Sequence, residues 1–484
     1  MKKKILFLQP LHEKLSYYGI RRRFIFPYGL AYLSTILLDN DYEVEIFDAH
    51  AEQLSKEKVM EKLKGKEFDI LGISAFSTQY NAVKIISKFV KEELGKKVII
   101  GGPLGTYNHS LTLERCCVDA VVLGEAEKNI LDLLRYLDNP EKLIKVRGIA
   151  FKKDGKIVKT EEQEYIQNLD LLPKPAYHMF DMKRYLAGEL FETRYVQLNK
   201  QKKYLNKKIM TVFTSRGCPY SCRFCSRNYR GARFMSINRV INELKYFKEK
   251  YNIDGVHFSD ELFIFSQERM EEFVNKLRPL NLFWSAQARV NLINEKIMKI
   301  IKDGGCTGIG LGIESGSQKI LNNMAKMITV SQIEKVMKAA KKVNLGVKVQ
   351  LIFGYPGEDE QTIQETIGMF KRIDHPGKRF NLITPIPGSP LYDECIEKGI
   401  ITDEDKYLIG LEKSFGKDKV QINFTQWSDD ELTKKMKETE KIIKENYFSR
   451  NLGRFMRWKL FKLQRLIKGK FNGLKLRIKP LLSS

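Results

Sequence analysis

The chain has 484 residues, of which 43% are hydrophobic and 30% charged, a composition typical of globular domains rather than of a disordered chain or a fibre. Its 84 Lys and Arg residues against 59 Asp and Glu residues give a net charge of +25, which favours an anionic partner such as a nucleic acid, a membrane surface or an anionic substrate. No uncharged run reaches the roughly 20 apolar residues of a membrane span, and seven cysteines without a signal peptide indicate a reducing, cytoplasmic setting.

Residues 1–145 alternate short apolar runs with helical patterns, which predicts a parallel sheet covered on both faces. The expected strands are 4–8, 43–47, 69–74, 97–101 and 119–123, and the expected helices are 29–39, 52–64, 80–94 and 126–137. The pattern is that of a doubly wound, flavodoxin-like α/β domain, whose ligand site lies at the carboxyl ends of its strands.

The alternation stops in residues 146–205, where we expect a hairpin around Asp154–Gly155 followed by a proline-containing linker. It returns in residues 206–400. The expected strands there are 210–215, 254–259, 283–288, 307–313, 347–353 and 379–385, and the expected helices are 236–250, 267–277, 293–303, 330–343 and 359–373. Six strand–helix steps predict a partial (β/α)6 barrel with its active-site residues just after the strand ends.

Three of the seven cysteines crowd into one loop after the first expected barrel strand. Cys218, Cys222 and Cys225 have the spacing C-x3-C-x2-C. Thiolates suit both iron–sulfur clusters and zinc, but a structural zinc ion needs four ligands. The nearest later candidates, His257 and Cys306, are far along the chain. Three ligands leave one iron of a four-iron cluster open; a zinc site completed from elsewhere, or unrelated buried thiols, are the other interpretations.

This loop resembles that of the radical S-adenosylmethionine (SAM) superfamily, C-x3-C-x-aromatic-C, with Phe224 in the aromatic place. The resemblance covers about residues 205–400. It implies a 4Fe–4S cluster that binds SAM through its open iron and generates a 5′-deoxyadenosyl radical, with the protein positioning and insulating the cofactors. By their position after successive strands, further residues match the places where the family contacts SAM: Ser259, Asp260, Glu261, Arg289, Glu314 and Ser315.

The amino-terminal domain resembles the cobalamin-binding domains of some radical SAM enzymes. Ser74 ends a strand, and Gly101–Gly102 follow with 26 residues between them, as in those domains. Gly124 and Glu125 resemble their GEGE turn, and FPYGLAYLSTIL resembles their first helix start. The DxHxxG motif of a histidine lower ligand is missing after the first strand. We therefore expect cobalamin to bind without such a ligand and His50 to be a loop or helix-start residue; loss of cobalamin binding is the alternative.

The end of the chain differs in charge from the rest. Residues 401–449 have the pattern of a helical extension of mixed charge, whereas residues 450–484 contain eleven Lys or Arg and no Asp or Glu. Apolar residues at helical spacing between these charges predict an amphipathic helix that lies on an anionic membrane surface. An RNA-binding arm or a helix packed on the barrel are the alternatives.

Together these features predict an anaerobic, cytoplasmic radical SAM enzyme whose cofactors are a 4Fe–4S cluster, SAM and cobalamin. The resemblance implies methylation of an unactivated carbon through a 5′-deoxyadenosyl radical and methylcobalamin. Oxidative cyclisation or rearrangement with the same cofactors is the alternative chemistry, and a metal-bearing nucleic-acid-binding module is the alternative of another class. Expected partners are a small-molecule or lipid-like substrate, a flavodoxin or ferredoxin type electron donor, and the inner face of the membrane.

Overall fold

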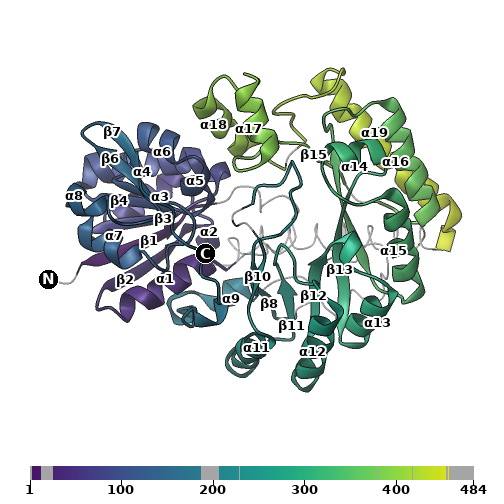
Figure 1. Ribbon diagram of the computed structural model, residues 1–484, viewed down its shortest axis with the longest axis horizontal. Helices are drawn as coiled ribbons and strands as arrows, with labels where there is room; N and C mark the ends of the chain where they lie inside the picture. Colours follow the sequence, from purple (N-terminus) through teal and green to yellow (C-terminus); the bar gives the residue numbers. More distant parts are fainter. Residues whose placement is uncertain are drawn as a thin grey trace, which may run out of the picture.

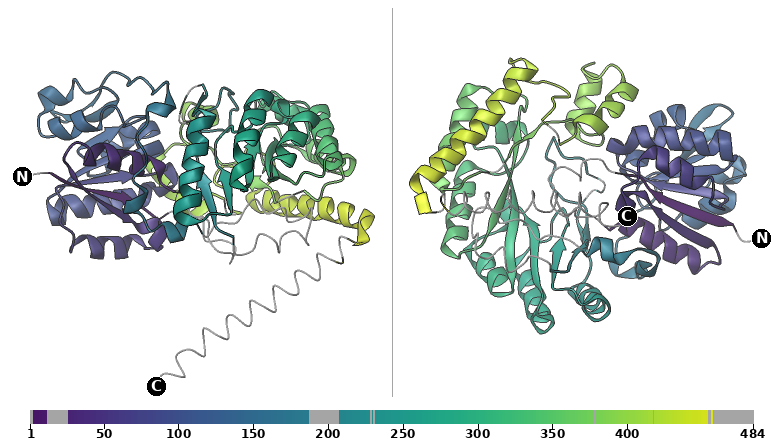
Figure 2. Two further views of the ribbon diagram at one scale, coloured as in Figure 1. Left: turned by 90° about the horizontal axis from the view of Figure 1, so that it is seen from below. Right: turned by 180° about the vertical axis from the view of Figure 1, so that it is seen from behind.

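A computed structural model describes residues 3–11, 26–186, 207–227, 229, 231–377, 379–416, 418–453 and 456. Two α/β units lie side by side, the amino-terminal one built on one sheet and the other on an open, curled sheet (Figures 1 and 2). Of the expected basic tail, only residues 450–453 and 456 are described, so the prediction for the rest lies outside the described residues. None of the described helices is both long and apolar enough to cross a membrane.

The amino-terminal sheet has seven strands, and its first five are parallel in the flavodoxin-like order. In spatial order they are β2 (Glu43–Asp48), β1 (Lys4–Gln9), β3 (Ile70–Ser74), β4 (Lys97–Gly101), β5 (Ala120–Val122), β6 (Ile149–Lys153) and β7 (Lys156–Lys159). The expected hairpin around Asp154–Gly155 is β6–β7, and β6 pairs antiparallel with β5. The sheet therefore continues beyond the boundary expected at residue 145.

Alternation of side chains along β1 explains why helices cover both faces of this sheet. Ile5 and Phe7 join one apolar cluster, which includes residues of α1 and α7, whereas Leu6 and Leu8 join another, which includes residues of α3 and α4. The helices of this unit are α1 (Tyr28–Leu38), α2 (Ala49–Glu52), α3 (Lys56–Leu63), α4 (Tyr80–Leu94), α5 (Gly102–Tyr107), α6 (His109–Arg115), α7 (Ile130–Tyr136) and α8 (Pro140–Leu143).

The second sheet is the predicted partial barrel. Its six strands are all parallel and follow one another in chain order: β8 (Ile209–Val212), β11 (Gly255–Phe258), β12 (Phe283–Ala288), β13 (Cys306–Glu314), β14 (Val347–Phe353) and β15 (Asn381–Leu382). The helices α11 (Ile237–Tyr251), α12 (Gln267–Leu277), α13 (Glu295–Asp303), α14 (Gln318–Asn323), α15 (Val330–Lys342) and α16 (Glu360–Ile373) surround its outer side (Figure 1). The predicted fold class is confirmed.

Local capping fixes where five of the barrel helices begin. At each start a polar side chain accepts a hydrogen bond from a backbone N–H of the first turn, which would otherwise have no partner. The capping residues of α11, α12, α13, α15 and α16 are Ser236, Ser266, Asn294, Thr329 and Asp359. Because the strands are all parallel, the loops that leave their carboxyl ends toward these helices lie at the same rim of the barrel.

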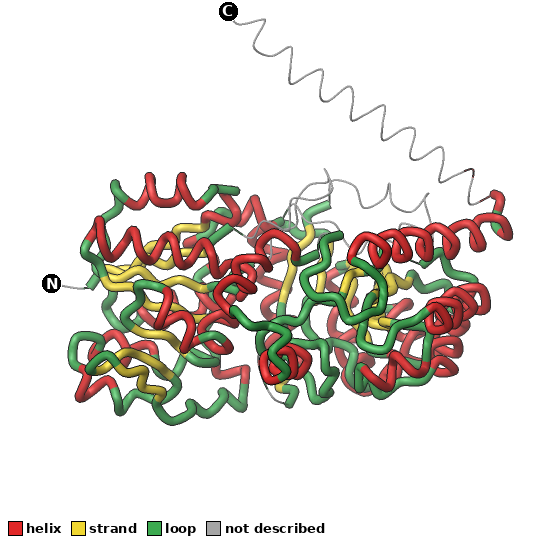
Figure 3. The backbone as a smooth tube through the Cα atoms, turned by 90° about the horizontal axis from the view of Figure 1, so that it is seen from above, coloured by secondary structure: helices red, strands yellow, loops and turns green. Residues whose placement is uncertain are grey.

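Three helices follow the barrel, and the second of them packs on the amino-terminal unit. They are α17 (Pro390–Glu397), α18 (Glu404–Ser414) and α19 (Asp429–Arg450), with the short α9 (Met182–Tyr185) in the linker. Leu408 and Leu411 of α18 share an apolar cluster with Val83 of α4, so the expected helical extension packs back on the amino-terminal unit. Figure 3 shows the two units as neighbouring bodies, and in Figure 2 the yellow α19 lies along the barrel. The largest apolar cluster likewise contains residues of both units, including Tyr28 and Phe247.

Candidate active site

The loop that carries the three cysteines leaves the rim of the barrel and returns to it. It runs over residues 217–232 between two short strands, β9 (Ser215–Arg216) and β10 (Arg233–Phe234), which pair with each other. Gly217 has a φ of +85°, and a Cβ atom there would lie 2.3 Å from the carbonyl oxygen of Gly231. Only glycine fits, so the backbone itself holds the two ends of the loop together.

The three thiols are at least partly buried in this loop. Cys222 is buried and the other two are half-buried. Burial raises the pKa of the Cys218 thiol and raises that of Cys225 to about 12, so deprotonation of these two thiols would accompany metal binding.

Among the described residues no three Cys, His, Asp or Glu side chains converge as they would around one metal ion. A four-iron cluster does not require this, because each thiolate binds a different iron. Three thiols on one loop therefore fit the cluster as a donor set.

A cationic side chain approaches Cys222 from the end of the third barrel strand. The guanidinium of Arg289 lies 3.5 Å from the sulfur of Cys222 and 3.7 Å from the centre of the Tyr220 ring, and it donates a hydrogen bond to the carbonyl of Lys326. Arg289 is one of the predicted SAM-binding residues, and the structure brings it against the cluster loop. A fixed positive charge beside a cluster thiolate would stabilise its negative charge.

Glu314 and Lys326 form a buried ion pair beside this arginine. The Lys326 ammonium lies 2.8 Å from the Glu314 carboxylate, and both side chains are 8% exposed. The same ammonium lies 5.5 Å from the centre of the Phe224 ring. Glu314 has a φ of +66°, rare for a residue with a side chain, which turns the chain at the end of β13. The sequence offered no signal for Lys326, since it precedes α15 outside any motif.

Asp260, another of the predicted SAM-binding residues, is bonded to the start of the cluster loop. Its buried carboxylate accepts hydrogen bonds from the backbone N–H groups of Thr214 (2.6 Å) and Ser215 (2.5 Å) and from both hydroxyls. It thereby fixes the backbone that leads into the cluster loop. Burial raises the pKa of Asp260 despite these bonds. Ser259, half-buried, donates its backbone N–H to Val212.

Ser315 lies within a small hydrogen-bonded turn. Its hydroxyl is 3.4 Å from that of Thr366 in α16 and accepts the N–H of Ser317. Its side chain is therefore bonded to the barrel helix, while its predicted contact with SAM stays a prediction.

One cavity, of about 380 Å³, lies between the two units. It opens over the carboxyl ends of β3, β4 and β5 on one side and over the base of the cluster loop on the other. Glu261 lines it from the barrel, and burial raises the pKa of its carboxyl, with a further contribution from Asp260. All five predicted cobalamin-binding residues line it as well: Ser74, Gly101, Gly102, Gly124 and Glu125. The structure thus brings the predicted cobalamin-binding residues and one predicted SAM-binding residue, Glu261, to one space.

The walls of the cavity suit a large, mainly apolar ring system. Tyr28, Tyr32, Phe76 and Phe213 are among its aromatic residues. Gly29, in the first turn of α1, lines the cavity and is exposed, and nothing lies within 4 Å of where its Cβ atom would be, so a side chain there would meet no neighbour. This cradle fits the expected cobalamin.

Two glycines line the cavity from the amino-terminal unit, whereas one histidine of that unit is not among its described lining residues. Gly102 has a φ of +82°, and a Cβ atom there would lie 2.9 Å from the carbonyl oxygen of Ala75. Gly124 has a φ of +78°. His50 lies in the first turn of α2, as expected of a helix-start residue, and is not among the described residues that line the cavity.

Two arginines that the sequence analysis missed connect the units. Arg216 and Arg233, at the two ends of the cluster loop, both form ion pairs with Glu125. Arg216 is two residues before Cys218, so its place beside the cysteine motif was the signal that could have found it.

Comparisons with known proteins agree with this geometry. The family model of the radical SAM superfamily matches residues 212–370, and that of the B12 binding domain matches residues 22–134. An uncharacterized methyltransferase of Pyrococcus horikoshii is 33% identical over 384 residues, which are 78% of this chain and 79% of that protein.

Two further proteins extend the comparison. An anaerobic magnesium-protoporphyrin IX monomethyl ester cyclase of Rubrivivax gelatinosus is 27% identical over 79% of this chain and 68% of its own. The fold resembles the radical S-adenosylmethionine methyltransferase TsrM of Kitasatospora setae, solved with cobalamin and a 4Fe–4S cluster. That match has a TM-score of 0.63 and 17% identity, and covers 82% of this chain and 75% of TsrM.

Proposed function

The chain belongs to the radical SAM enzymes that carry a cobalamin-binding domain, and we propose from this that it methylates an unactivated carbon of its substrate with SAM as the methyl source. A 4Fe–4S cluster, SAM and cobalamin are the cofactors of this family, and when bound they supply a radical derived from SAM and a carrier for the methyl group. The observation that carries the proposal is the shared cavity, lined by Ser74 and Gly101 from one unit and by Glu261 from the other.

The chain's own residues hold and insulate these groups. Cys218, Cys222 and Cys225 would bind the cluster. Arg289 contributes a positive charge beside Cys222, and Glu261, whose carboxyl pKa is raised by burial, keeps a proton at the cavity wall to a higher pH than an exposed glutamate does. The proposed contacts with SAM come from Phe224 in the cluster loop and from residues after the strand ends, namely Ser259, Asp260, Glu261, Arg289, Glu314 and Ser315.

The proposal is tested by product analysis. Anaerobically purified and reconstituted protein is incubated with SAM, a reductant and a cell extract, and nucleoside products are separated by mass spectrometry. Methyl transfer should produce both S-adenosylhomocysteine and 5′-deoxyadenosine, together with a product about 14 mass units heavier than its substrate. Label from methyl-deuterated SAM should appear in that product.

Oxidative cyclisation is the second candidate, because the Rubrivivax relative is named a cyclase. It would produce 5′-deoxyadenosine and a product without S-adenosylhomocysteine or transferred label. That outcome would replace the methylation proposal and leave the family assignment intact.

The substrate, the electron donor and the location of the enzyme are further parts of the proposal. We propose a small or lipid-like substrate, a flavodoxin or ferredoxin type electron donor, and attachment of a cytoplasmic enzyme to an anionic membrane through residues 450–484, whose eleven Lys or Arg residues have no acidic counterpart. Co-sedimentation with anionic liposomes at low and high salt tests the attachment. Equal pelleting of the full chain and of a chain truncated at Asn451 would contradict it.

A further inference from the structure

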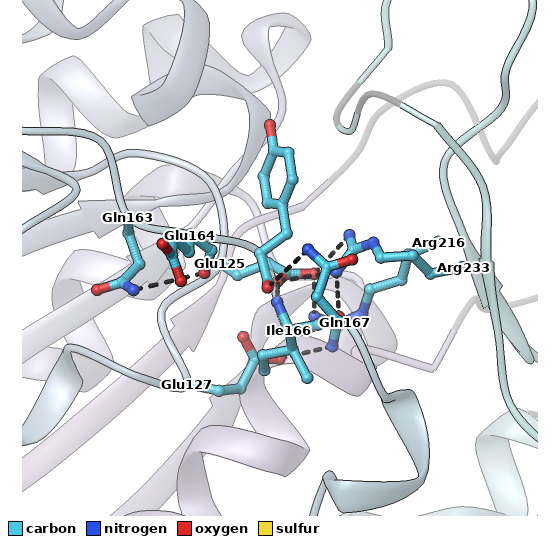
Figure 4. A network of polar contacts seen from close by, with 9 residues as sticks. Glu125, Glu127, Gln163, Glu164, Ile166, Gln167, Arg216 and Arg233 are labelled. Carbon is cyan, nitrogen blue, oxygen red and sulfur yellow. Dashed lines mark hydrogen bonds and ion pairs between the residues drawn. The ribbon is translucent and has the colours of Figure 1, made fainter.

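A small cluster of charges joins the cluster loop to the amino-terminal unit. Arg216 ends β9 and Arg233 begins β10, and the two residues face each other in the antiparallel pair at the base of the loop. Their guanidinium groups both reach into the other unit and meet the carboxylate of Glu125, which follows β5 (Figure 4). The two ends of the cysteine loop are therefore held by one acidic side chain of the neighbouring unit.

The carboxylate of Glu125 has no acceptor capacity left. Its Oε1 accepts from Arg216 (2.7 Å) and Arg233 (2.9 Å), and its Oε2 accepts from Arg233 (3.1 Å) and from the backbone N–H of Ile166 (2.7 Å). A carboxylate has about four lone-pair sites, and all four are used here. Glu125 lines the cavity, but it cannot also bind a polar group of a ligand without breaking one of these bonds.

The network is buried and balanced in charge. The side chain of Glu125 is 1% exposed and that of Arg233 is 9% exposed. Glu127 supplies a second carboxylate, 2.6 Å from Arg216, so two arginines face two glutamates. Burial by itself would raise the pKa of Glu125, but Arg233 and Arg216 outweigh it and lower that pKa. Moving or removing one member would leave a buried charge unpaired, which is energetically costly. The four side chains therefore hold one another in a single arrangement.

A second contact reaches the same loop from α5. The hydroxyl of Tyr107, at the end of the helix that Gly102 begins, donates a hydrogen bond to the carbonyl of Arg227. The Tyr107 ring also packs on Gly388, where a Cβ atom would lie 2.5 Å from it. The elements that carry the glycines of the cobalamin site and the element that carries the cysteines are thus fixed to one another at two places.

We propose that Glu125 is a positioning residue, which sets the distance between the cobalamin site and the iron–sulfur cluster through Arg216 and Arg233. This differs from the expectation that it contacts cobalamin. The inference rests on the presence of both cofactors, as the family assignment gives them, and does not depend on whether the reaction is methylation or cyclisation.

The test compares Glu125→Gln with the parent holoenzyme, reconstituted with iron, sulfide and cobalamin. Glu161→Gln is the matched control, because Glu161 also pairs with an arginine, Arg147, but its side chain is 77% exposed and outside the interface. Iron and cobalamin contents are measured first. Pulsed electron paramagnetic resonance then gives the distance distribution between Co(II) and the reduced cluster. The ratio of 5′-deoxyadenosine to final product is determined in parallel.

Glu125→Gln should retain cluster and cobalamin but broaden the Co(II)–cluster distance distribution, and should raise 5′-deoxyadenosine formed without product at least threefold. The control should behave like the parent. A tenfold weaker cobalamin affinity with an unchanged Co(II)–cluster distance would show that Glu125 contacts cobalamin instead. The proposal would also be overturned if neither the Co(II)–cluster distance nor the ratio of 5′-deoxyadenosine to product changed. If Glu125→Gln does not fold, Arg216→Lys decides: it keeps the charge but loses the two-pronged contact, and a parent-like distance distribution in that variant would reject the inference.

Discussion

At the scale of single residues, the site depends on side chains that are buried before any cofactor binds. The Cys222 sulfur, the Arg289 guanidinium and the Glu314–Lys326 pair lie within one connected set of contacts. Buried charges of this kind persist only when each has a partner, so the positions of these groups depend on one another. A substitution at one of them therefore affects its neighbours as well as the ligand.

Replacing Cys218, Cys222 and Cys225 together by alanine should abolish the cluster, because no other described thiol lies on this loop. Iron and acid-labile sulfide are counted after anaerobic reconstitution, and the expected loss is about four irons per chain. Cys306→Ala is the control, since its buried thiol begins β13 at the opposite end from Glu314. Retention of iron in the triple variant would refute the assignment.

Glu358 should make the stability of the folded protein depend measurably on pH. Its carboxylate, 6% exposed, accepts the N–H of Gly354 after β14, and burial raises its pKa to about 8. In the unfolded chain a glutamate titrates at about 4.3. Between these values the unfolded state releases a proton that the folded state keeps, so this group lowers stability as pH rises through that window.

Glu358→Gln keeps the size and the acceptor but removes the titration. The melting temperature of the variant minus that of the parent should therefore be larger at about pH 8.5 than at about pH 5. Each unit by which the pKa is raised corresponds to about 1.4 kcal/mol of stability. Calorimetry at both pH values provides the measurement. A difference between the two proteins that is independent of pH would contradict the placement of this carboxyl.

At the scale of elements, strand ends and helix starts carry the site. Most of these elements could be predicted from the sequence: the expected helices 80–94 and 267–277 coincide with α4 and α12, and the expected strand 347–353 coincides with β14. In each of them apolar residues recur at the spacing of a helix or a strand, because those residues are buried on one or two faces of the element. The short helices α5 and α6 were missed, because a turn or two of helix leaves too short a pattern.

The contacts between elements were harder to predict. That β6 would pair with β5, or that Glu125 would meet an arginine 91 residues later in the chain, follows from packing of the whole chain and has no local signature. The sequence could therefore identify which residues follow strands, but not which of them bond to one another. The bonds that the carboxylates of Glu125 and Asp260 make within the protein had no signal in the sequence, while the predicted contacts of these residues with ligands stay predictions.

The start of α1 should control cobalamin binding without affecting stability. Gly29 lines the cavity and has nothing within 4 Å of the position of its Cβ atom, so we expect Gly29→Phe to place a ring at the cavity wall without a clash. We expect cobalamin affinity to fall at least tenfold, or about 1.4 kcal/mol, while the melting temperature of the cobalamin-free protein stays within experimental error. Binding is measured by absorbance titration. Gly65→Phe, on a turn that does not line the cavity, is the control, and equal affinities of the two variants would refute the cavity as the cobalamin site.

At the scale of the whole molecule, the two units share their apolar cores. Residues of both occur in the largest cluster, and α18 closes the contact from the other side: Asp405 pairs with Lys84 at 2.7 Å and also accepts from the hydroxyl of Tyr80. Interfaces this extensive make relative motion of the units costly. The molecule is therefore expected to unfold as one cooperative body rather than unit by unit.

Leu408→Ala tests this coupling. Leu408 is 0% exposed between α18 and the amino-terminal unit, so truncation should cost about 2–5 kcal/mol and lower a single calorimetric transition. Ile400→Ala is the control, because that side chain is 46% exposed and should have little effect. Two separated transitions in the variant, with the barrel transition unchanged, would show that the units are independent.

The return of α18 to α4 also has a consequence for synthesis on the ribosome. The apolar face of α4 that Leu408 and Leu411 cover exists once α4 itself has emerged, but its covering helix is encoded more than three hundred residues later. At about 5–20 residues per second, roughly 300 residues take roughly 15–60 s to translate. During that interval the nascent amino-terminal unit presents an uncovered apolar surface, which makes it a client for chaperones that act on ribosome-bound chains.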